Sequence, residues 1–89
     1  MKGVHVYVSG KVQGIGFRAT VQKHALGHNL RGFARNLKDG RVEIYVQGDA
    51  ESVEAFLREI QENPGGAVIT QFKAQEEKLR EIPHSFEIQ

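Results

Sequence analysis

The residues best suited to chemistry are concentrated in a glycine-rich stretch near the start of the chain. Gly10, Gly14 and Gly16 separate an alternating segment from a helix-like one, and Arg18 follows directly. Glycines allow the backbone to curl so that several N–H groups point at one anion, and the first N–H groups of a helix lack intrahelical partners. An arginine adds an always-charged guanidinium that can hold two phosphate oxygens at once. The stretch is therefore a candidate phosphate-binding loop.

The position of Arg18 supports this hypothesis. The N-terminus of a helix carries a partial positive charge, so an arginine there is electrostatically unfavourable, and a bound anion would offset that cost. A plain tight turn with a surface arginine is the alternative, and the loop alone does not decide between the two.

The four histidines form no comparable group. His24 and His28 are four residues apart, a spacing that metal sites use, but no third ligand lies near them in the sequence. His5 falls on the strand face opposite its valine neighbours, and His84 lies in the terminal segment. We interpret all four as surface or partly packed residues. Cysteine is absent, which excludes disulfide scaffolds, thiolate zinc sites and cysteine nucleophiles.

Hydrophobic periodicity predicts the elements that must position the loop. Val4, Val6 and Val8 alternate with other residues, which is typical of a half-buried strand. From Phe17 the apolar residues recur every fourth position, which predicts a helix face. A second amphipathic helix, which Asp49 can cap, is predicted from apolar residues at helical spacing. These residues are Val53, Phe56, Leu57 and Ile60.

Strands account for most of the remaining chain. The predicted strands are 30–36, 42–47 and 67–74. A tight turn at 37–40 with an Asp-Gly pair joins the first two of them. In the last, Val68, Thr70 and Phe72 are expected on one face. The polar stretch 75–83 is predicted to be a surface loop or partial strand, and residues 86–88 a short extended piece.

The resulting order is βαββαβ. One antiparallel sheet with two helices on one face buries these apolar stripes most economically, and a single domain over residues 1–89 is expected. Asn36, at the end of the second strand, can lie near the glycine loop if the first two strands do not pair directly, or if the loop reaches across an edge. The sequence leaves this choice open.

Length and composition set further limits. The chain has 89 residues, 39% of them hydrophobic, and a net charge of +1. This is enough for one small core, and the charge does not favour nucleic acid or a membrane surface as a partner. No apolar run approaches a membrane span, and the first residues do not form a signal peptide. We therefore expect a soluble, cytoplasmic protein, and a monomer.

Two look-alike motifs suggest other functions. Residues 14–19 match the dinucleotide fingerprint, but no acidic residue ends the second strand as that fold requires, and the chain is short for it. Residues 31–34 match the start of an RNA-recognition motif, whose domain shares the βαββαβ order. Here the match falls on the second strand instead of the third, and its continuation lacks the aromatic that would stack a base. RNA binding is the alternative function.

Two longer segments carry a resemblance to a known family. The first is residues 8–18, VSGKVQGIGFR, and the second begins with GFARN at 32–36 and continues through Gly40, Val42 and Gly48. Both resemble the signatures of the acylphosphatases, with Ile15 where valine is usual. Two matched signatures in so short a chain are much more specific than a glycine loop alone.

The resemblance implies a ferredoxin-like α/β sandwich that hydrolyses small acyl phosphates to carboxylate and inorganic phosphate. It implies that Arg18 binds the phosphate and that Asn36 orients the attacking water. It also implies that backbone N–H groups of the loop cradle the phosphate, with neither metal nor cofactor. The loop residues concerned are Gln13, Gly14, Ile15, Gly16, Phe17 and Arg18.

Overall fold

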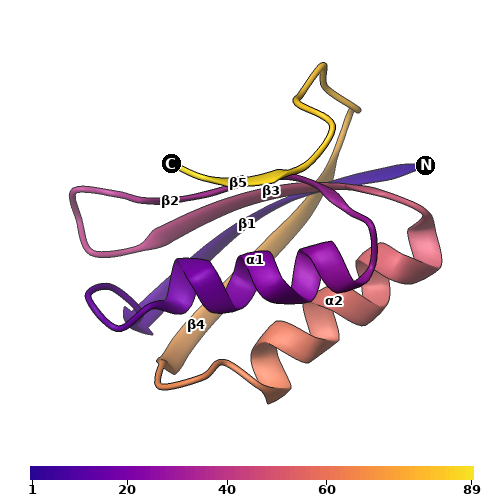
Figure 1. The fold of residues 1–89 in the computed structure, drawn as a ribbon. Helices are drawn as coiled ribbons and strands as arrows, with labels where there is room; N and C mark the ends of the chain where they lie inside the picture. Colours follow the sequence, from indigo (N-terminus) through magenta and orange to yellow (C-terminus); the bar gives the residue numbers. More distant parts are fainter.

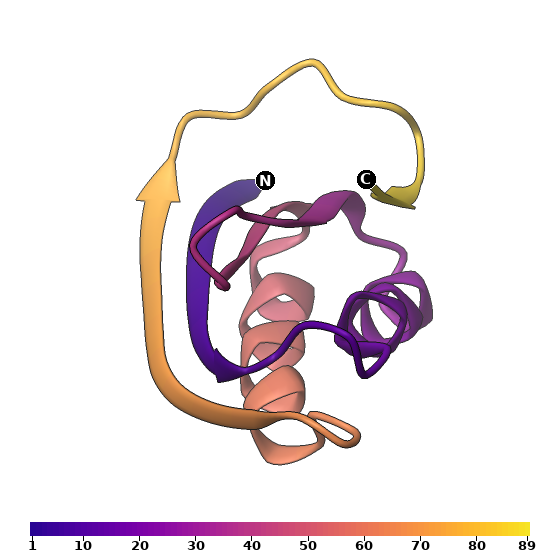
Figure 2. The same ribbon diagram turned by 90° about the vertical axis from the view of Figure 1, so that its left-hand side faces the viewer.

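Two helices pack on one face of a five-stranded sheet in the computed structural model, which describes all 89 residues (Figure 1). Figure 2 shows both helices on the same side of the sheet. The elements in chain order are β1 (Lys2–Lys11), α1 (Phe17–Gly27), β2 (Arg31–Asn36), β3 (Val42–Gly48), α2 (Ala50–Glu62), β4 (Val68–Glu77) and β5 (Phe86–Ile88). The predicted fold class is confirmed as a ferredoxin-like α+β arrangement.

The strand order decides where the glycine loop lies. The order is β4-β1-β3-β2-β5, and β3 pairs antiparallel with both β1 and β2. The first two strands therefore run in the same direction on either side of β3, and both end at the same edge of the sheet. This places the loop after β1 on the same side as Asn36, the last residue of β2.

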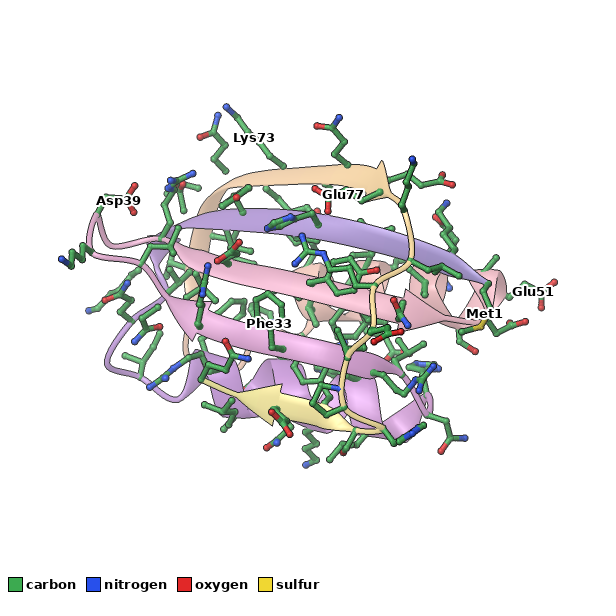
Figure 3. The ribbon with its side chains drawn as sticks, turned by 90° about the horizontal axis from the view of Figure 1, so that it is seen from above. Met1, Phe33, Asp39, Glu51, Lys73 and Glu77 are labelled. Atoms are coloured by element: carbon green, nitrogen blue, oxygen red, sulfur yellow. The ribbon has the colours of Figure 1, made fainter.

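One strand pairing differs from the all-antiparallel sheet that we predicted. β5 pairs parallel with β2, from Gly32 opposite Phe86 to Ala34 opposite Ile88, so the sheet is mixed. The reason is that β4 ends at the side of the sheet where β2 begins. The chain then crosses the face that the helices leave open and re-enters beside β2 in the same direction (Figure 3).

The helix faces agree with the prediction. Phe17, Val21 and Ala25 of α1 are buried in the core. The buried residues of α2 are Val53, Phe56 and Ile60, and Leu57 packs against the core as a partly buried neighbour. The Asp49 carboxylate accepts a hydrogen bond from the Ser52 N–H, as an N-cap should. Neither helix is long and apolar enough to cross a bilayer.

The prediction that Val68, Thr70 and Phe72 share one face of the fourth strand is wrong. Ile69 and Phe72 pack against the core, whereas Val68 is 58% exposed. The register explains the difference, because Ser9 lies opposite Gln71 while Gly10 lies opposite Ile69. Thr70 has no partner on β1 and forms a β-bulge. The bulge interrupts the alternation of side chains between the two faces of the sheet. The strand also continues to Glu77, beyond the predicted end at residue 74.

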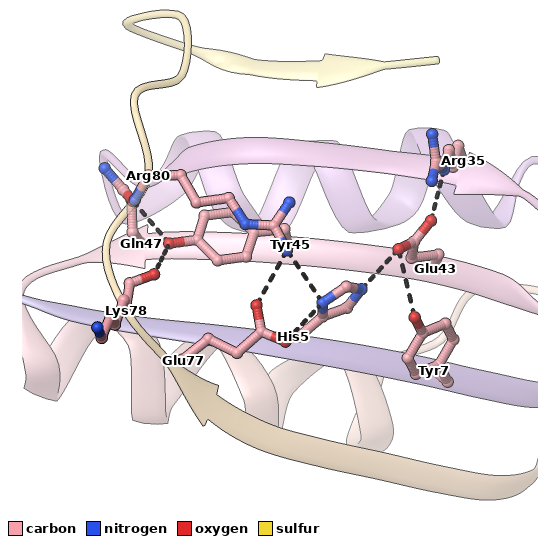
Figure 4. Close-up of polar contacts among 9 residues, drawn as sticks. All are labelled: His5, Tyr7, Arg35, Glu43, Tyr45, Gln47, Glu77, Lys78 and Arg80. Carbon is pink, nitrogen blue, oxygen red and sulfur yellow. Dashed lines mark hydrogen bonds and ion pairs between the residues drawn. The ribbon is translucent and has the colours of Figure 1, made fainter.

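A polar cluster occupies the open face of the sheet (Figure 4). Glu43 is only 5% exposed, and its carboxylate lies 2.6 Å from His5 Nε2 and accepts a 2.5 Å hydrogen bond from Arg35 Nε. Burial alone would raise the pKa of the Glu43 carboxyl, but the hydrogen bonds and charges of Arg35 and His5 outweigh it and the pKa lies below its usual value. His5 Nδ1 lies 2.9 Å from Glu77 Oε2.

We expect Glu43→Gln to lower the free energy of unfolding by about 2 kcal/mol at pH 7, because it removes charge-assisted hydrogen bonds from a buried group. Since the folded-state pKa is lowered from 4.5, this stability is present above that pH and is lost as the pH falls through the folded-state pKa. Urea unfolding of the unmodified protein and of Glu43→Gln should show that the difference in their free energies of unfolding decreases from pH 7 to pH 2. If that difference did not change with pH, the stabilisation could not come from a charged Glu43.

Candidate active site

The loop between β1 and α1 has the backbone geometry of an anion cradle. Gly14 and Gly16 adopt φ of 76° and 78°, in the left-handed region that favours glycine. Gly16 immediately precedes α1, and no side chain caps this helix. The N–H groups of Gly14, Ile15 and Gly16 make no hydrogen bond within the chain. These donors, at the positive end of a helix dipole, are available to an anion.

A small pocket of about 150 Å³ adjoins this loop. It is bounded by the loop, the start of α1, the end of β2 and β5, through Val12, Gly14, Gly16, Phe17, Arg18, Ala19, Asn36 and Ile88. The structure therefore brings together the two side chains that the sequence singled out, from positions 18 residues apart. At about 30 Å³ per water molecule, the pocket has room for a group of the size of phosphate.

Two of the predicted loop residues do not line the pocket. Ile15 packs against the hydrophobic core. The Gln13 amide is directed to the turn between β2 and β3, where it donates to two backbone carbonyls. The contribution of these residues to an anion site is thus limited to their backbone.

Arg18 has a partner that sequence reasoning missed. Its Nη1 donates a 2.7 Å hydrogen bond to the main-chain oxygen of Gln89. Gln89 is held there because its own N–H donates to the Ala34 carbonyl, which extends the pairing of β5 with β2. This contact orients the guanidinium and leaves its other N–H groups without a partner in the chain. No sequence signal pointed to it, because it depends on the parallel pairing of the final strand.

Asn36 lies opposite Val42 at the end of the β2–β3 ladder. Its side chain is exposed and makes no hydrogen bond to the rest of the chain. The amide can therefore both donate and accept toward a molecule in the pocket.

The helical histidines lie outside this pocket. His24 Nδ1 and His28 Nε2 face the two oxygens of Glu59 at 3.2 and 2.7 Å, across the α1–α2 interface. The hydrogen bond from His28 is the largest influence that lowers the pKa of the Glu59 carboxyl. A broad hollow of about 690 Å³ adjoins them, but neither Arg18 nor Asn36 lines it. No three histidine, aspartate or glutamate side chains are placed to hold a metal ion.

The aromatic residues of the open sheet face do not form a stacking surface for RNA. Tyr45 is buried, and the guanidinium of Arg80 lies 4.3 Å above its ring centroid. Arginines also cover the other two rings, with Arg41 over Tyr7 at 4.8 Å and Arg35 over Phe33 at 5.6 Å. Bases stack on exposed aromatic faces, so this geometry disfavours the alternative function.

Comparison with known proteins places the chain in a family. The Acylphosphatase family model matches residues 4–88. An acylphosphatase of Synechococcus sp. is 42% identical over 85 residues, which cover 96% of this chain and 89% of the relative. An acylphosphatase of Chlorobaculum tepidum is 44% identical over 75 residues, covering 84% of this chain and 82% of the relative.

Solved structures give the same result. The crystal structure of acylphosphatase from Bacillus subtilis superposes with a TM-score of 0.92 at 33% identity, covering 99% of this chain and 98% of that one. The match to the family model runs from β1 to β5 and includes every element that lines the pocket. The chain therefore belongs to the acylphosphatase family.

Proposed function

We propose that the protein hydrolyses the carboxyl–phosphate bond of small acyl phosphates by direct, metal-free attack of one oriented water molecule. Membership of the acylphosphatase family establishes the reaction class. The observation that supports this mechanism is the shared pocket, which is lined by the glycine loop, Arg18 and Asn36.

The phosphoryl group is held by the loop. Its negative charge meets the unpaired N–H groups at the start of α1 and the guanidinium of Arg18. Charge on the phosphoryl oxygens must be stabilised throughout phosphoryl transfer, and donors that are already in place do so without reorganisation.

The attacking water is held by Asn36. The amide oxygen accepts a hydrogen bond from the water and holds the water oxygen in line with the bond to be broken. The water oxygen bonds to phosphorus as the bond from phosphorus to the acyl oxygen breaks, and the electron pair leaves with the carboxylate. The proton of the water passes to a phosphate oxygen. A carboxylate is a good leaving group, so the reaction requires no general acid, and because the phosphate takes the proton of the water it requires no basic side chain.

We also propose that the working unit is a cytoplasmic monomer. One copy of the chain supplies both Arg18 and Asn36 to the pocket, which is consistent with a monomer. Light scattering during gel filtration checks the monomer, and cell fractionation checks the location.

The decisive test is phosphate release from benzoyl phosphate by the purified protein. We expect turnover in buffer alone, with a rate that is unchanged within experimental error after prolonged treatment with EDTA. Arg18 and the loop N–H groups supply the charge stabilisation that a metal ion supplies elsewhere. Loss of the rate in EDTA, followed by its return with a divalent ion, would contradict the metal-free mechanism. The complete absence of turnover would contradict the proposed function itself.

A further inference from the structure

The side chain of Gln13 joins the phosphate-binding loop to the turn that follows Asn36. Its Nε2 donates one hydrogen bond to the Leu37 carbonyl at 2.8 Å and a second to the Arg41 carbonyl at 2.9 Å. The glutamine therefore uses both hydrogens of its amide nitrogen on backbone groups that are 24 and 28 residues away in the sequence.

The two carbonyls lie at the base of the turn between β2 and β3. The Leu37 N–H donates to the Arg41 carbonyl at 2.8 Å, and the Gly40 N–H donates to the Leu37 carbonyl at 3.2 Å. A carbonyl oxygen can accept two hydrogen bonds, and Gln13 occupies the second site on each. Asn36 immediately precedes Leu37, so its backbone is held at the same point.

The bonds of Gln13 are the direct side-chain link between the glycine loop and the turn after Asn36. β1 pairs with β3 only as far as Val8 opposite Val42, and beyond that point it pairs only with β4, as far as Lys11 opposite Val68. No other side-chain hydrogen bond joins residues 12–18 to residues 36–41. Gln13 directly precedes Gly14, whose left-handed backbone lines the pocket. Gln13 is therefore the one residue whose side chain ties the loop directly to the turn that follows Asn36.

We propose that Gln13 is a positioning residue for the hydrolysis of acyl phosphates. Its side chain does not line the pocket, and it acts by fixing the phosphate-binding loop relative to Asn36, so that the water and the phosphorus atom are aligned. The inference rests on the proposed mechanism. It assigns a task to the Gln13 side chain that differs from the phosphate-binding task of the backbone around it.

Two substitutions of Gln13 test whether its side-chain amide is required. Methionine has a similar length but no donor, so Gln13→Met removes both hydrogen bonds with little change in volume. Glutamate has the same shape but presents only acceptors to two carbonyl oxygens, and Gln13→Glu is expected to push the loop from the turn. Gln61→Met is the matched control, because Gln61 is exposed and bonds only within α2.

The test compares kcat, KM and competitive inhibition by inorganic phosphate. A misalignment of about 1 Å can cost 10²-fold in rate, and we expect Gln13→Met to lower kcat by about 10-fold and Gln13→Glu by more. Inhibition by phosphate, which reports on the loop alone, should change by less than about threefold in Gln13→Met. Gln61→Met should match the unmodified protein. Circular dichroism confirms that each variant is folded at the assay temperature.

A double-mutant cycle shows whether Gln13 acts through Asn36. In an Asn36→Ala background, Gln13→Met should change kcat by less than about twofold, because the residue being positioned is already gone. Unchanged kcat in Gln13→Met, or an equal loss in both backgrounds, would overturn the inference. A strong loss of phosphate inhibition would also overturn it, because Gln13 would then shape the loop itself. Failure of the unmodified protein to hydrolyse benzoyl phosphate would instead refute the proposed function, so the two failures are distinguishable.

Discussion

Arg18→Lys is expected to lower kcat for acyl phosphate hydrolysis almost as much as Arg18→Ala, by about 10²–10³-fold. Lysine keeps the positive charge but loses the planar fork that can hold two phosphoryl oxygens. The structure strengthens this expectation, because Arg18 Nη1 donates a hydrogen bond to the main-chain oxygen of Gln89 and the guanidinium is oriented before the substrate arrives. A single ammonium group cannot both keep that contact and make two hydrogen bonds to the phosphoryl group in the same geometry.

Steady-state kinetics with benzoyl phosphate provide the measurement for Arg18. The matched control is Arg58→Lys, because Arg58 is exposed on α2 and makes no ion pair. The control should retain full activity. If Arg18→Lys retained near-normal turnover, positive charge alone would be sufficient, and the bidentate role of Arg18 would have to be abandoned.

Asn36→Asp and Asn36→Ala should both remain folded and lose about 10²-fold in kcat, with a much smaller change in KM. Alanine removes the group that holds the water. Aspartate keeps an acceptor but loses the amide donor, and it adds a negative charge beside an anionic substrate. Because Asn36 is exposed and its side chain makes no hydrogen bond to the chain, neither substitution removes a contact that stabilises the fold.

The aspartate variant separates a catalytic role from a structural one. Aspartate is as acceptable as asparagine in most turns, so a residue needed only for the turn should tolerate the change. Asn63→Asp, at the exposed end of α2, is the corresponding control and should not alter turnover. Wild-type turnover in Asn36→Asp would show that another group holds the attacking water.

Local features of the sequence were sufficient to predict the loop and most of the elements. The change from alternating to helical spacing at Phe17 marks the start of α1, and the glycines before it take the left-handed conformations that curl the loop. The capping of α2 by Asp49 was predicted in the same way. Periodicity, capping and glycine conformation depend on residues close together in the chain, so a single sequence carries them.

The face of β4 shows where local pattern is insufficient. The alternation of Val68, Thr70 and Phe72 suggested one buried side, but a bulge opposite Ser9 and Gly10 puts Ile69 on the core side. The bulge arises from pairing with β1, which lies about sixty residues earlier in the chain. The sequence of β4 alone does not contain that information.

The sequence by itself determined the residue types of the site, namely a glycine loop with free N–H donors, one arginine beside it and one asparagine at a strand end. Only the tertiary structure decided that they share a pocket, because β3 inserts between β1 and β2 and brings their ends to one edge. It also decided that β5 returns beside β2 and places the main-chain oxygen of Gln89 against Arg18. Strand order results from the competition among long-range pairings to bury the whole apolar surface, and no short segment specifies it.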